Sequence, residues 1–298
     1  MKKKILIIGG KGFIGSHICR YLKMLNYNVV ASSRKQDIDC VKLDLTKDKV
    51  SDCNAYDCII NLAVGSKETI IEGTKNLVNN LLQSSFSGKY IHFSTMEVFN
   101  NGQGICDDDT TPLPKTLYGI QKFEAEKILK SSPNSLKYLI VRPSCVVGEN
   151  SVIWYERPIQ LLKQNRLGYL GSYGEGQANL IHINDLLVVI NKLIESKFKR
   201  KAINLSGDYN ISWNNYLKQI CSQKKIEFKH IPEATINFEI KFLSYLIKSL
   251  ELMKIKKYPP LTKNFIEVTK SKKKITSSFL NDVMKIKYLP INQFFNDN

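Results

Sequence analysis

Short runs of apolar, often β-branched residues alternate with longer stretches of helical periodicity through the first half of the chain. The helical stretches are Phe13–Leu25, Lys67–Gln83 and Tyr118–Lys130. Runs such as ILII, CIIN and YLIV are almost continuously apolar, which is typical of strands buried on both faces. Strands that alternate with helices predict an α/β fold with a doubly wound parallel sheet, whose ligands bind at the carboxyl ends of the strands. The expected strands are Lys4–Ile8, Asn28–Ser32, Cys40–Leu43, Asp57–Leu62, Lys89–Ser94 and Leu136–Arg142.

The pattern changes after Gly148. The stretch Asn150–Gly176 combines a helix-like piece with a loop rich in Gly and Tyr. A short apolar run at Leu180–Ile183, a helix at Asp185–Glu195 and a strand at Ala202–Leu205 follow. Beyond this strand the sequence is mostly helical with short extended pieces.

Two units are therefore expected. Residues 1–149, with about 177–205, form the sheet domain. Residues of about 150–176, with 206–298, form a smaller, mainly C-terminal α/β lobe that closes over the strand ends.

The chain of 298 residues carries a formal net charge of +17, which raises the question of a polyanionic partner. Its lysines are spread along the sequence, and the densest basic stretch is Lys254–Lys274. A solvated face explains this stretch better than a nucleic-acid site, and a small phosphate-bearing substrate needs only one or two of these cations. We expect no nucleic-acid partner.

Seven cysteines without a CxxC pair favour free thiols in a reducing cytoplasm, and no metal site is expected. The apolar run after the first lysines is too short for a signal peptide. No run approaches the roughly 20 apolar residues of a membrane span. The segment Ile236–Met253 is interrupted by charges, so we expect an amphipathic helix packed on the protein, with surface membrane contact as a minor alternative.

Glycines are concentrated directly after the first strand, where the sequence reads IIGGKGFIGS. Gly9, Gly12 and Gly15 follow a strand and open a helix. Such glycines let the backbone approach a pyrophosphate, and the helix N-terminus offers free N–H groups to it. A tight strand–helix turn without a ligand is the alternative, but this context favours dinucleotide binding in a Rossmann arrangement.

The end of the second strand discriminates between cofactors. NAD sites usually carry an acid there for the ribose 2′-hydroxyl. Here Ser33 and Arg34 stand at the strand end, and Arg34 can hold a 2′-phosphate with Lys11 of the glycine loop. This pattern favours NADP over NAD, although these cations can also be ordinary surface charges.

A YxxxK pattern opens the helix at Tyr118. Tyr118 and Lys122 share a helix face, so the ammonium is expected to lower the pKa of the phenol and make it a general acid/base. Thr95 follows a strand and can orient a substrate carbonyl. The alternatives are an exposed helical pair and an ordinary strand-end hydroxyl.

These motifs occur in a fixed order: GGxGFIG, FSTMEVF, YGIQKFEAE, VRPSCVVGEN and LIHINDL. Together they resemble the extended short-chain dehydrogenase/reductases, and more narrowly the NAD(P)-dependent nucleotide-sugar epimerases, dehydratases and reductases. The resemblance spans residues 5 to about 190. It implies a catalytic triad of Thr95, Tyr118 and Lys122, and by analogy a homodimer.

The resemblance also implies further site residues. Tyr118 and Lys122 would contact the cofactor as well. The other implied cofactor contacts are Gly9, Lys11, Gly12, Phe13, Ile14, Gly15, Ser33, Arg34, Asp44, Leu45, Leu62, Ala63, Pro143 and Val146. Implied substrate contacts are Met96, Glu97, Ser144 and His182. For Asp44, His182 and Asp185, a loop cap, a core histidine and a helix N-cap are equally good interpretations.

One departure from the family pattern narrows the range of reactions that the chain is expected to catalyse. The family's 4,6-dehydratases carry an Asp-Glu pair after the catalytic Thr, where this chain has Met96-Glu97. A thioether cannot move a proton, so a dehydratase is disfavoured. The first hypothesis is an NADPH-dependent reductase of a 4-keto nucleotide sugar, the second a 4-epimerase with tightly held NAD(P), and the third a non-catalytic NADP-binding protein. The sequence leaves the nucleotide and the sugar open.

Overall fold

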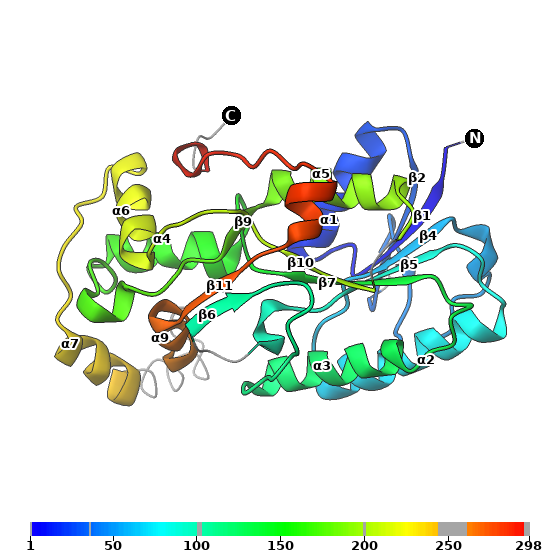
Figure 1. Ribbon diagram of the computed structural model, residues 1–298, viewed down its shortest axis with the longest axis horizontal. Coiled ribbons are helices and arrows are strands. Elements are labelled where there is room, and N and C mark those ends of the chain that lie inside the picture. The colour runs from blue at the N-terminus through cyan, green and yellow to red at the C-terminus, as the bar shows by residue number, and fades with distance from the viewer. Residues whose placement is uncertain (1, 36, 100–102, 199–200, 244–260, 295–298) are drawn as a thin grey trace.

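Seven parallel strands form the central sheet of the protein (Figure 1). The computed structural model describes residues 2–35, 37–99, 103–198, 201–243 and 261–294. The strand order is β3-β2-β1-β4-β5-β7-β10, so the chain winds outward from β1 in both directions. The bounds are β1 (Lys4–Ile8), β2 (Asn28–Ser33), β3 (Val41–Lys42), β4 (Cys58–Asn61), β5 (Lys89–Phe93), β7 (Tyr138–Pro143) and β10 (Ala202–Leu205).

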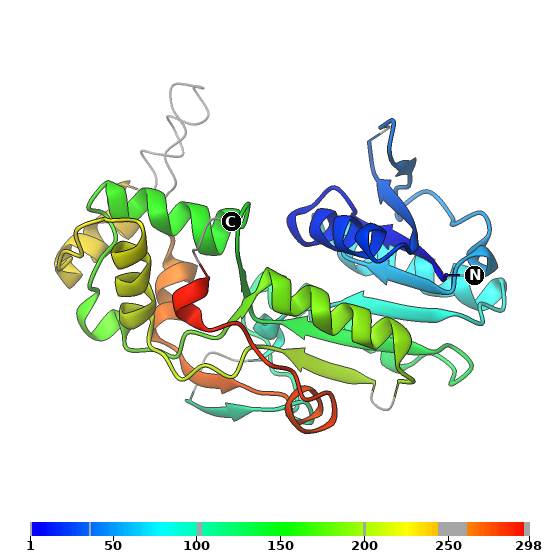
Figure 2. The same ribbon diagram turned by 90° about the horizontal axis from the view of Figure 1, so that it is seen from above.

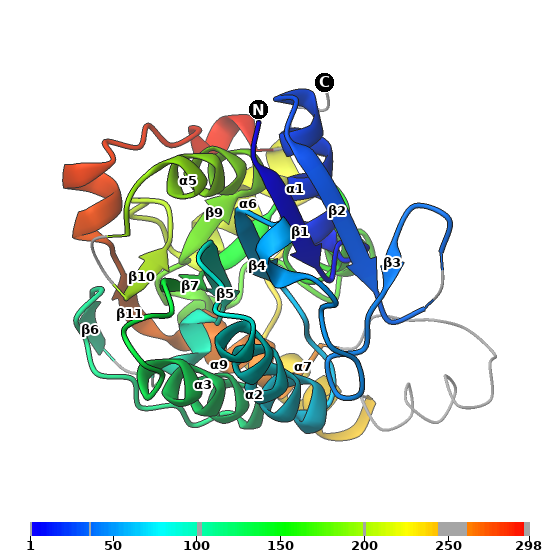
Figure 3. The ribbon, with the colours of Figure 1, turned by 90° about the vertical axis from the view of Figure 1, so that its right-hand side faces the viewer.

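Helices cover both faces of this sheet, as Figure 3 shows most clearly. Successive residues of a strand point to opposite faces. Accordingly, Ile5 and Ile7 of β1 pack in the cluster with α1 and α5, whereas Leu6 and Ile8 pack in the cluster with α2 and α3. The prediction of a doubly wound sheet with doubly buried strands is confirmed. The four helices are α1 (Phe13–Met24), α2 (Lys67–Gln83), α3 (Leu117–Lys130) and α5 (Ile183–Glu195).

The predicted element bounds differ from the observed ones mainly at the ends. The strand predicted at Cys40–Leu43 is reduced to Val41–Lys42, at the edge of the sheet. The helix predicted from Asp185 begins at Ile183, because the ring of His182 caps it by accepting a hydrogen bond from Asn184 N.

A second lobe lies beside the carboxyl ends of the strands (Figure 2). Its core is an apolar cluster that contains Trp213, Leu161 and Phe265 together with Met96 and Phe99 from the segment after β5. The helices of the lobe are α4 (Arg157–Lys163), α6 (Trp213–Gln223), α7 (Glu233–Phe238) and α9 (Lys263–Lys270). Two parallel pairs lie beside it, β8 (Cys145–Val147) with β9 (Leu180–His182) and β6 (Gln103–Cys106) with β11 (Lys272–Ile275). The strands β6, β8 and β9 fall in ranges expected for the sheet domain, but Cys145, Val147 and Leu180 pack in the apolar cluster of the lobe.

The β6–β11 pair was not predicted, and it corrects the interpretation of the basic stretch. Lys273 of β11 is only 3% exposed, and its ammonium donates to Phe99 O at 3.0 Å. The expectation that Lys254–Lys274 forms a solvated face is therefore wrong at Lys273. Alternate residues of a strand point to opposite faces, and Lys273 points inward. Lys254, Lys256 and Lys257 of that stretch lie outside the described residues.

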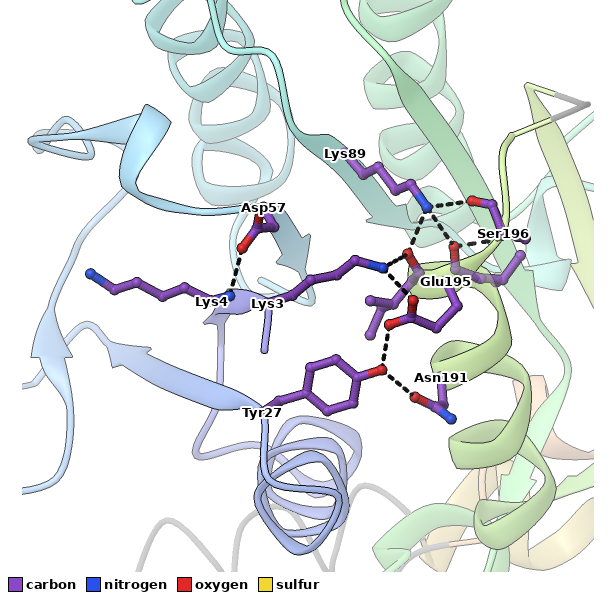
Figure 4. Close-up of polar contacts among 10 residues, drawn as sticks. Lys3, Lys4, Tyr27, Asp57, Lys89, Asn191, Glu195 and Ser196 are labelled. Carbon is purple, nitrogen blue, oxygen red and sulfur yellow. Dashed lines mark hydrogen bonds and ion pairs between the residues drawn. The ribbon is translucent and has the colours of Figure 1, made fainter. Parts of the chain in front are cut away.

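Two lysines at the amino ends of the strands hold the end of α5 (Figure 4). The Lys89 ammonium donates to Ile194 O at 2.6 Å and also to Ser196 O, and Lys3 pairs with Glu195. Tyr27 donates to Asn191 Oδ1 at 3.0 Å. The last carbonyl groups of a helix lack intrahelical partners, so these cations stabilise the C-terminus of α5.

All seven cysteines are free thiols, as expected. Within the described ranges, no helix has the length and apolarity needed to cross a membrane. The segment Ile236–Met253 is described only as far as Leu243, where it forms the end of α7 and one π-helical turn at Glu239–Leu243. The remainder of that predicted helix lies outside the described residues.

Candidate functional site

The glycine loop between β1 and α1 is built so that only glycine fits at two of its positions. Gly9 has φ +82°, and a side chain there would also press on the backbone of Leu62. A Cβ at Gly15 would lie 2.3 Å from Gly9 O, so the helix could not approach the strand. A Cβ at Gly12 would meet only Gly9 O at 3.4 Å, which leaves open space over the start of α1.

The N-terminus of α1 has no side-chain cap. Gly12 occupies the N-cap position, and no acidic residue lies in the first turn. In contrast, hydroxyl groups of Ser66, Thr116 and Ser212 cap α2, α3 and α6. The N–H groups at the first turn of α1, including those of Phe13 and Ile14, are therefore suited to a pyrophosphate. The loop fits the dinucleotide that the sequence predicts.

Charged residues gather at the end of β2. Arg34 is exposed, and its NH1 lies 3.5 Å from the position that a Cβ on Gly65 would take. Ser33 Oγ accepts a hydrogen bond from Lys35 N at 3.3 Å. The ammonium of Lys11, from the glycine loop, pairs with Asp37 at 3.0 Å, four residues beyond β2.

Asp44 and Leu45, two of the predicted cofactor contacts, have partners within the protein. Asp44 Oδ1 accepts hydrogen bonds from Thr46 Oγ1 at 2.7 Å and from Thr46 N at 3.0 Å, and these bonds lower the pKa of Asp44. The carboxylate therefore caps a loop, as the alternative interpretation proposed. Leu45 is 4% exposed and packs in the core beneath α2, so its predicted contact remains untested.

Lys122 lies where β4 and β5 end. It is only 1% exposed, and its ammonium donates to Phe93 O at 2.8 Å and to Ala63 O at 3.4 Å. Leu62 and Ala63, two predicted cofactor contacts, are half-buried beside it. Burial lowers the pKa of Lys122 to about 8, against the opposing charge of Glu126.

Tyr118 lies one turn before Lys122 on α3, with the Lys122 ammonium 6.0 Å from the centre of its ring. The expectation of a lowered pKa for Tyr118 is wrong for this structure. Tyr118 is 37% exposed, yet desolvation of the phenol by the surrounding protein and the charge of Glu97 raise the pKa of Tyr118 to about 12. A tyrosine is protonated at neutral pH even at its ordinary pKa of about 10, so Tyr118 can serve as a proton donor.

The segment after β5 holds the N-terminus of α3 in place. Thr95 Oγ1 accepts a hydrogen bond from Glu97 N at 3.2 Å and caps the short turn at Met96–Val98. Thr116, the cap of α3, donates to Glu97 Oε2 at 2.7 Å. Met96 is 5% exposed and packs in the apolar core of the second lobe. Glu97 is thus bound to a helix cap, and the substrate contacts predicted for Met96 and Glu97 remain untested.

A buried ionic cluster lies one further turn along α3, and the sequence analysis did not identify it. Glu126 is fully buried and accepts two hydrogen bonds from Arg142 of β7, at 2.9 and 2.8 Å. Ser94 Oγ donates to the same carboxylate at 2.6 Å. One sequence pattern could have predicted this cluster. Glu126 follows Lys122 by four residues, as Lys122 follows Tyr118, so all three lie on one face of the helix.

The segment after β7 supplies one buried hydroxyl without a described partner. Ser144 is 7% exposed, and its Oγ has no hydrogen-bond partner among the described residues, which suits a ligand contact. Pro143 is half-buried beside it, whereas Val146 is buried in the cluster beneath α5. Burial lowers the pKa of His182 to about 4, so this histidine is a neutral helix cap.

The sheet and the glycine loop thus define a dinucleotide-binding α/β protein. A model of the NAD dependent epimerase/dehydratase family matches residues 5–212. UDP-glucose 4-epimerase of Vibrio cholerae is 23% identical over 252 residues, which cover 74% of this chain and 75% of that protein. The chain belongs to the NAD-dependent epimerase/dehydratase family and is an enzyme of the extended short-chain dehydrogenase/reductase type.

Solved structures agree on the fold. A human epimerase family protein with NADPH superposes with a TM-score of 0.76 at 15% identity, covering 98% of this chain and 97% of that chain. The dTDP-4-dehydrorhamnose reductase of Bacillus anthracis, in complex with NADP, gives 0.66 at 20% identity and covers 99% of both chains. These structures confirm the predicted fold, and the family model confirms the predicted family.

Proposed function

We propose that the protein reduces a 4-keto nucleotide sugar with NADPH, and that Tyr118 donates the proton. The observation that carries this proposal is the placement of Tyr118 one turn before Lys122 on α3, with the Lys122 ammonium 6.0 Å from the centre of the Tyr118 ring and held by the carbonyl groups at the ends of β4 and β5. Reduction of a ketone needs a proton donor at the oxygen.

The residues that would hold the cofactor are those of the glycine loop, the first turn of α1, and the cations Lys11 and Arg34. NADPH supplies the hydride that adds to the carbonyl carbon. Lys122 is held by the carbonyl groups at the ends of β4 and β5, and its positive charge stabilises the tyrosinate that forms when Tyr118 gives up its proton.

Thr95 and Ser144 would orient the substrate carbonyl. Thr95 Oγ1 already accepts a hydrogen bond from Glu97 N, which leaves its O–H proton to donate to the substrate oxygen. The Ser144 hydroxyl, without a described partner, can do the same. A dehydratase mechanism lacks support, because Met96 is buried and Glu97 binds the cap of α3.

A 4-epimerase that recycles its cofactor uses the same three residues, and the similarity to UDP-glucose 4-epimerase favours this second candidate. The two functions differ in how they use the cofactor. An epimerase retains bound NAD(P) through purification and shows no net NADPH consumption. The absorbance spectrum of the supernatant after denaturation distinguishes them.

The direct test mixes the purified protein with NADPH and a panel of 4-keto nucleotide sugars, and follows the loss of NADPH absorbance. We expect oxidation with at least one sugar. The Tyr118→Phe variant should lose roughly 100-fold or more in turnover, because the proton donor is gone, while it still binds NADPH. A folded protein that oxidises no NADPH across the panel contradicts the reductase proposal.

Three further assignments are part of this proposal. The sheet domain binds the cofactor and the second lobe binds the nucleotide sugar. The enzyme works in a reducing cytoplasm, and it forms a homodimer. Light scattering of the purified protein tests the dimer.

A further inference from the structure

A buried lysine of the second lobe reaches the segment that carries Thr95. Lys273 of β11 is 3% exposed, and its ammonium donates to Phe99 O at 3.0 Å. Phe99 ends the short turn Met96–Val98, and Thr95 begins it. The C-terminal end of this turn is therefore held by a side chain that lies 174 residues further along the chain.

The other contacts of this turn lead to α3. Thr95 Oγ1 accepts a hydrogen bond from Glu97 N at 3.2 Å, and Glu97 Oε2 accepts one at 2.7 Å from Thr116, the N-cap of α3. Glu97 O lies so close to the helix that a Cβ on Gly119 would be 2.3 Å from it. A shift of the turn therefore changes the placement of Thr95 relative to Tyr118.

The backbone around Lys273 is fixed by two sets of hydrogen bonds. β11 pairs with β6, and Lys273 lies opposite Gly104 in this pair (Figure 1). The buried side chain of Asn179 donates to Lys273 O at 3.0 Å and accepts from Ile275 N at 2.8 Å. A lysine side chain has many rotamers in water, but here its backbone is fixed and its stem is enclosed. The ammonium therefore has a defined position.

A buried ammonium costs free energy that an apolar side chain would not. Burial lowers the pKa of Lys273, and the charge of Glu97 is one of the effects that oppose this shift. An apolar side chain of similar length would fill the same space without a buried charge. The ammonium adds what packing cannot supply, a charge-assisted and directional hydrogen bond to Phe99 O.

We propose that Lys273 is a positioning residue of the active site, whose ammonium fixes the turn after β5 and thereby the placement of Thr95 relative to Tyr118. This inference rests on the proposed function, in which Thr95 orients the substrate carbonyl and Tyr118 donates the proton. Lys273 acts through the backbone of Phe99 and takes no part in the proton transfer. The second lobe thus contributes to the geometry of the reaction as well as to the binding of the nucleotide sugar.

The test replaces the ammonium and keeps the length of the side chain, in the variant Lys273→Met. Its kcat, with a sugar that the wild type turns over, should fall about tenfold or more, because a small displacement of the reacting groups has such an effect. The dissociation constant of NADPH, measured by titration calorimetry, should change by less than about twofold. The same titration counts the folded binding sites, so kcat is expressed per site and partial unfolding cannot imitate the loss.

Lys272→Met is the matched control. Lys272 precedes Lys273 in β11, and its side chain is exposed. Its replacement should leave kcat within about twofold of the wild-type value. Hydrogen exchange of a peptide that spans Thr95–Phe99, followed by mass spectrometry, reports the turn without turnover. Exchange should be faster in Lys273→Met and unchanged in Lys272→Met.

The outcomes separate this inference from the proposed function. If kcat per site is unchanged in Lys273→Met, or falls equally in Lys272→Met, the positioning role is wrong and the reductase proposal stands. If kcat falls while exchange of the turn is unchanged, Lys273 does not act through the turn and the inference is again wrong. A wild-type protein that turns over no nucleotide sugar contradicts the proposed function itself, and the positioning role with it.

A second variant covers the case in which Lys273→Met does not fold. Lys273→Gln keeps an N–H donor of shorter reach and should lower kcat per site by about threefold. An unchanged kcat in this variant, together with unchanged exchange of the turn, overturns the positioning role.

Discussion

Lys122 illustrates, at the scale of one residue, how the proposed active site would lower the stability of the fold. Its ammonium is buried and held by two backbone carbonyl groups. Burial lowers its pKa from the usual 10.5 to about 8. The folded protein therefore keeps a charge that water would solvate better, in the position where a tyrosinate needs a neighbouring cation.

The pH dependence follows from this shift. Below pH 8 Lys122 is charged in both the folded and the unfolded state, and burial of the charge costs about 3 kcal/mol. Between pH 8 and 10.5 the unfolded state binds more protons, so the contribution of Lys122 to the free energy of unfolding rises with pH. If catalysis requires the charged ammonium, activity falls as the pH rises through about 8.

We predict that Lys122→Met raises the free energy of unfolding at pH 7 by about 1–3 kcal/mol, while activity is lost. The gain should shrink as the pH approaches 10.5. Urea unfolding of both proteins at several pH values measures it. Lys127→Met, at an exposed position of the same helix, is the control and should have little effect. A Lys122→Met protein that is less stable than wild type at pH 7 contradicts this account.

At the scale of elements, the N-terminus of α3 is the part of the site that most depends on its neighbours. Thr116 Oγ1 accepts a hydrogen bond from Gly119 N at 3.0 Å and donates one to Glu97. A Cβ on Gly119 would lie 2.3 Å from Glu97 O, so the helix and the Met96–Val98 turn are in direct contact. Tyr118 is placed by this contact.

Thr116→Ala should lower the free energy of unfolding by about 1 kcal/mol, because α3 loses its cap. It should also lower kcat about tenfold or more, because Tyr118 is displaced, with little change in NADPH affinity. Thr116→Ser keeps the hydroxyl and should restore both quantities. A Ser variant as impaired as the Ala variant shows that the methyl group, not the hydrogen bonds, matters.

The sequence predicted the bounds of an element well where the buried positions of that element are also its apolar positions. The bounds of β1, α2 and β10 match the predicted ones, since β1 and β10 are short buried runs and α2 is a capped amphipathic helix. The sequence did not predict β11. The KKKI stretch indicates a charged surface, and Lys273 is buried only because β11 pairs with β6. The Tyr118–Lys122 spacing was visible, but the raised pKa of Tyr118 depends on burial and on Glu97, which no spacing reveals.

At the scale of the molecule, the two units share a core. Met96, Val98 and Phe99 leave the sheet at the end of β5 and pack with Trp213 of α6 in the second lobe. The segment after β11 returns to the sheet domain, where Phe279 and Leu280 pack in the cluster beneath α5, and Phe294 packs again in the second lobe. Neither unit can therefore unfold without exposing apolar surface of the other.

We predict one cooperative unfolding transition. The chain has two tryptophans, and the rings of Trp154 and Trp213 lie 5.5 Å apart in the second lobe. Their fluorescence reports this lobe, whereas far-UV circular dichroism reports the whole chain. The two signals should change at the same urea concentration. A fluorescence transition at distinctly lower urea shows that the lobe unfolds independently.

The N-terminus of α1, which has no side-chain cap, would make the stability of the fold depend on the supply of the proposed cofactor. A helix start without a cap of its own is completed when an anion binds to its free N–H groups. Any ligand that binds only the folded chain stabilises it, by about 2.7 kcal/mol at a hundred times its dissociation constant. The fraction of this enzyme that escapes unfolding and proteolysis would then rise and fall with the cell's supply of nicotinamide dinucleotide.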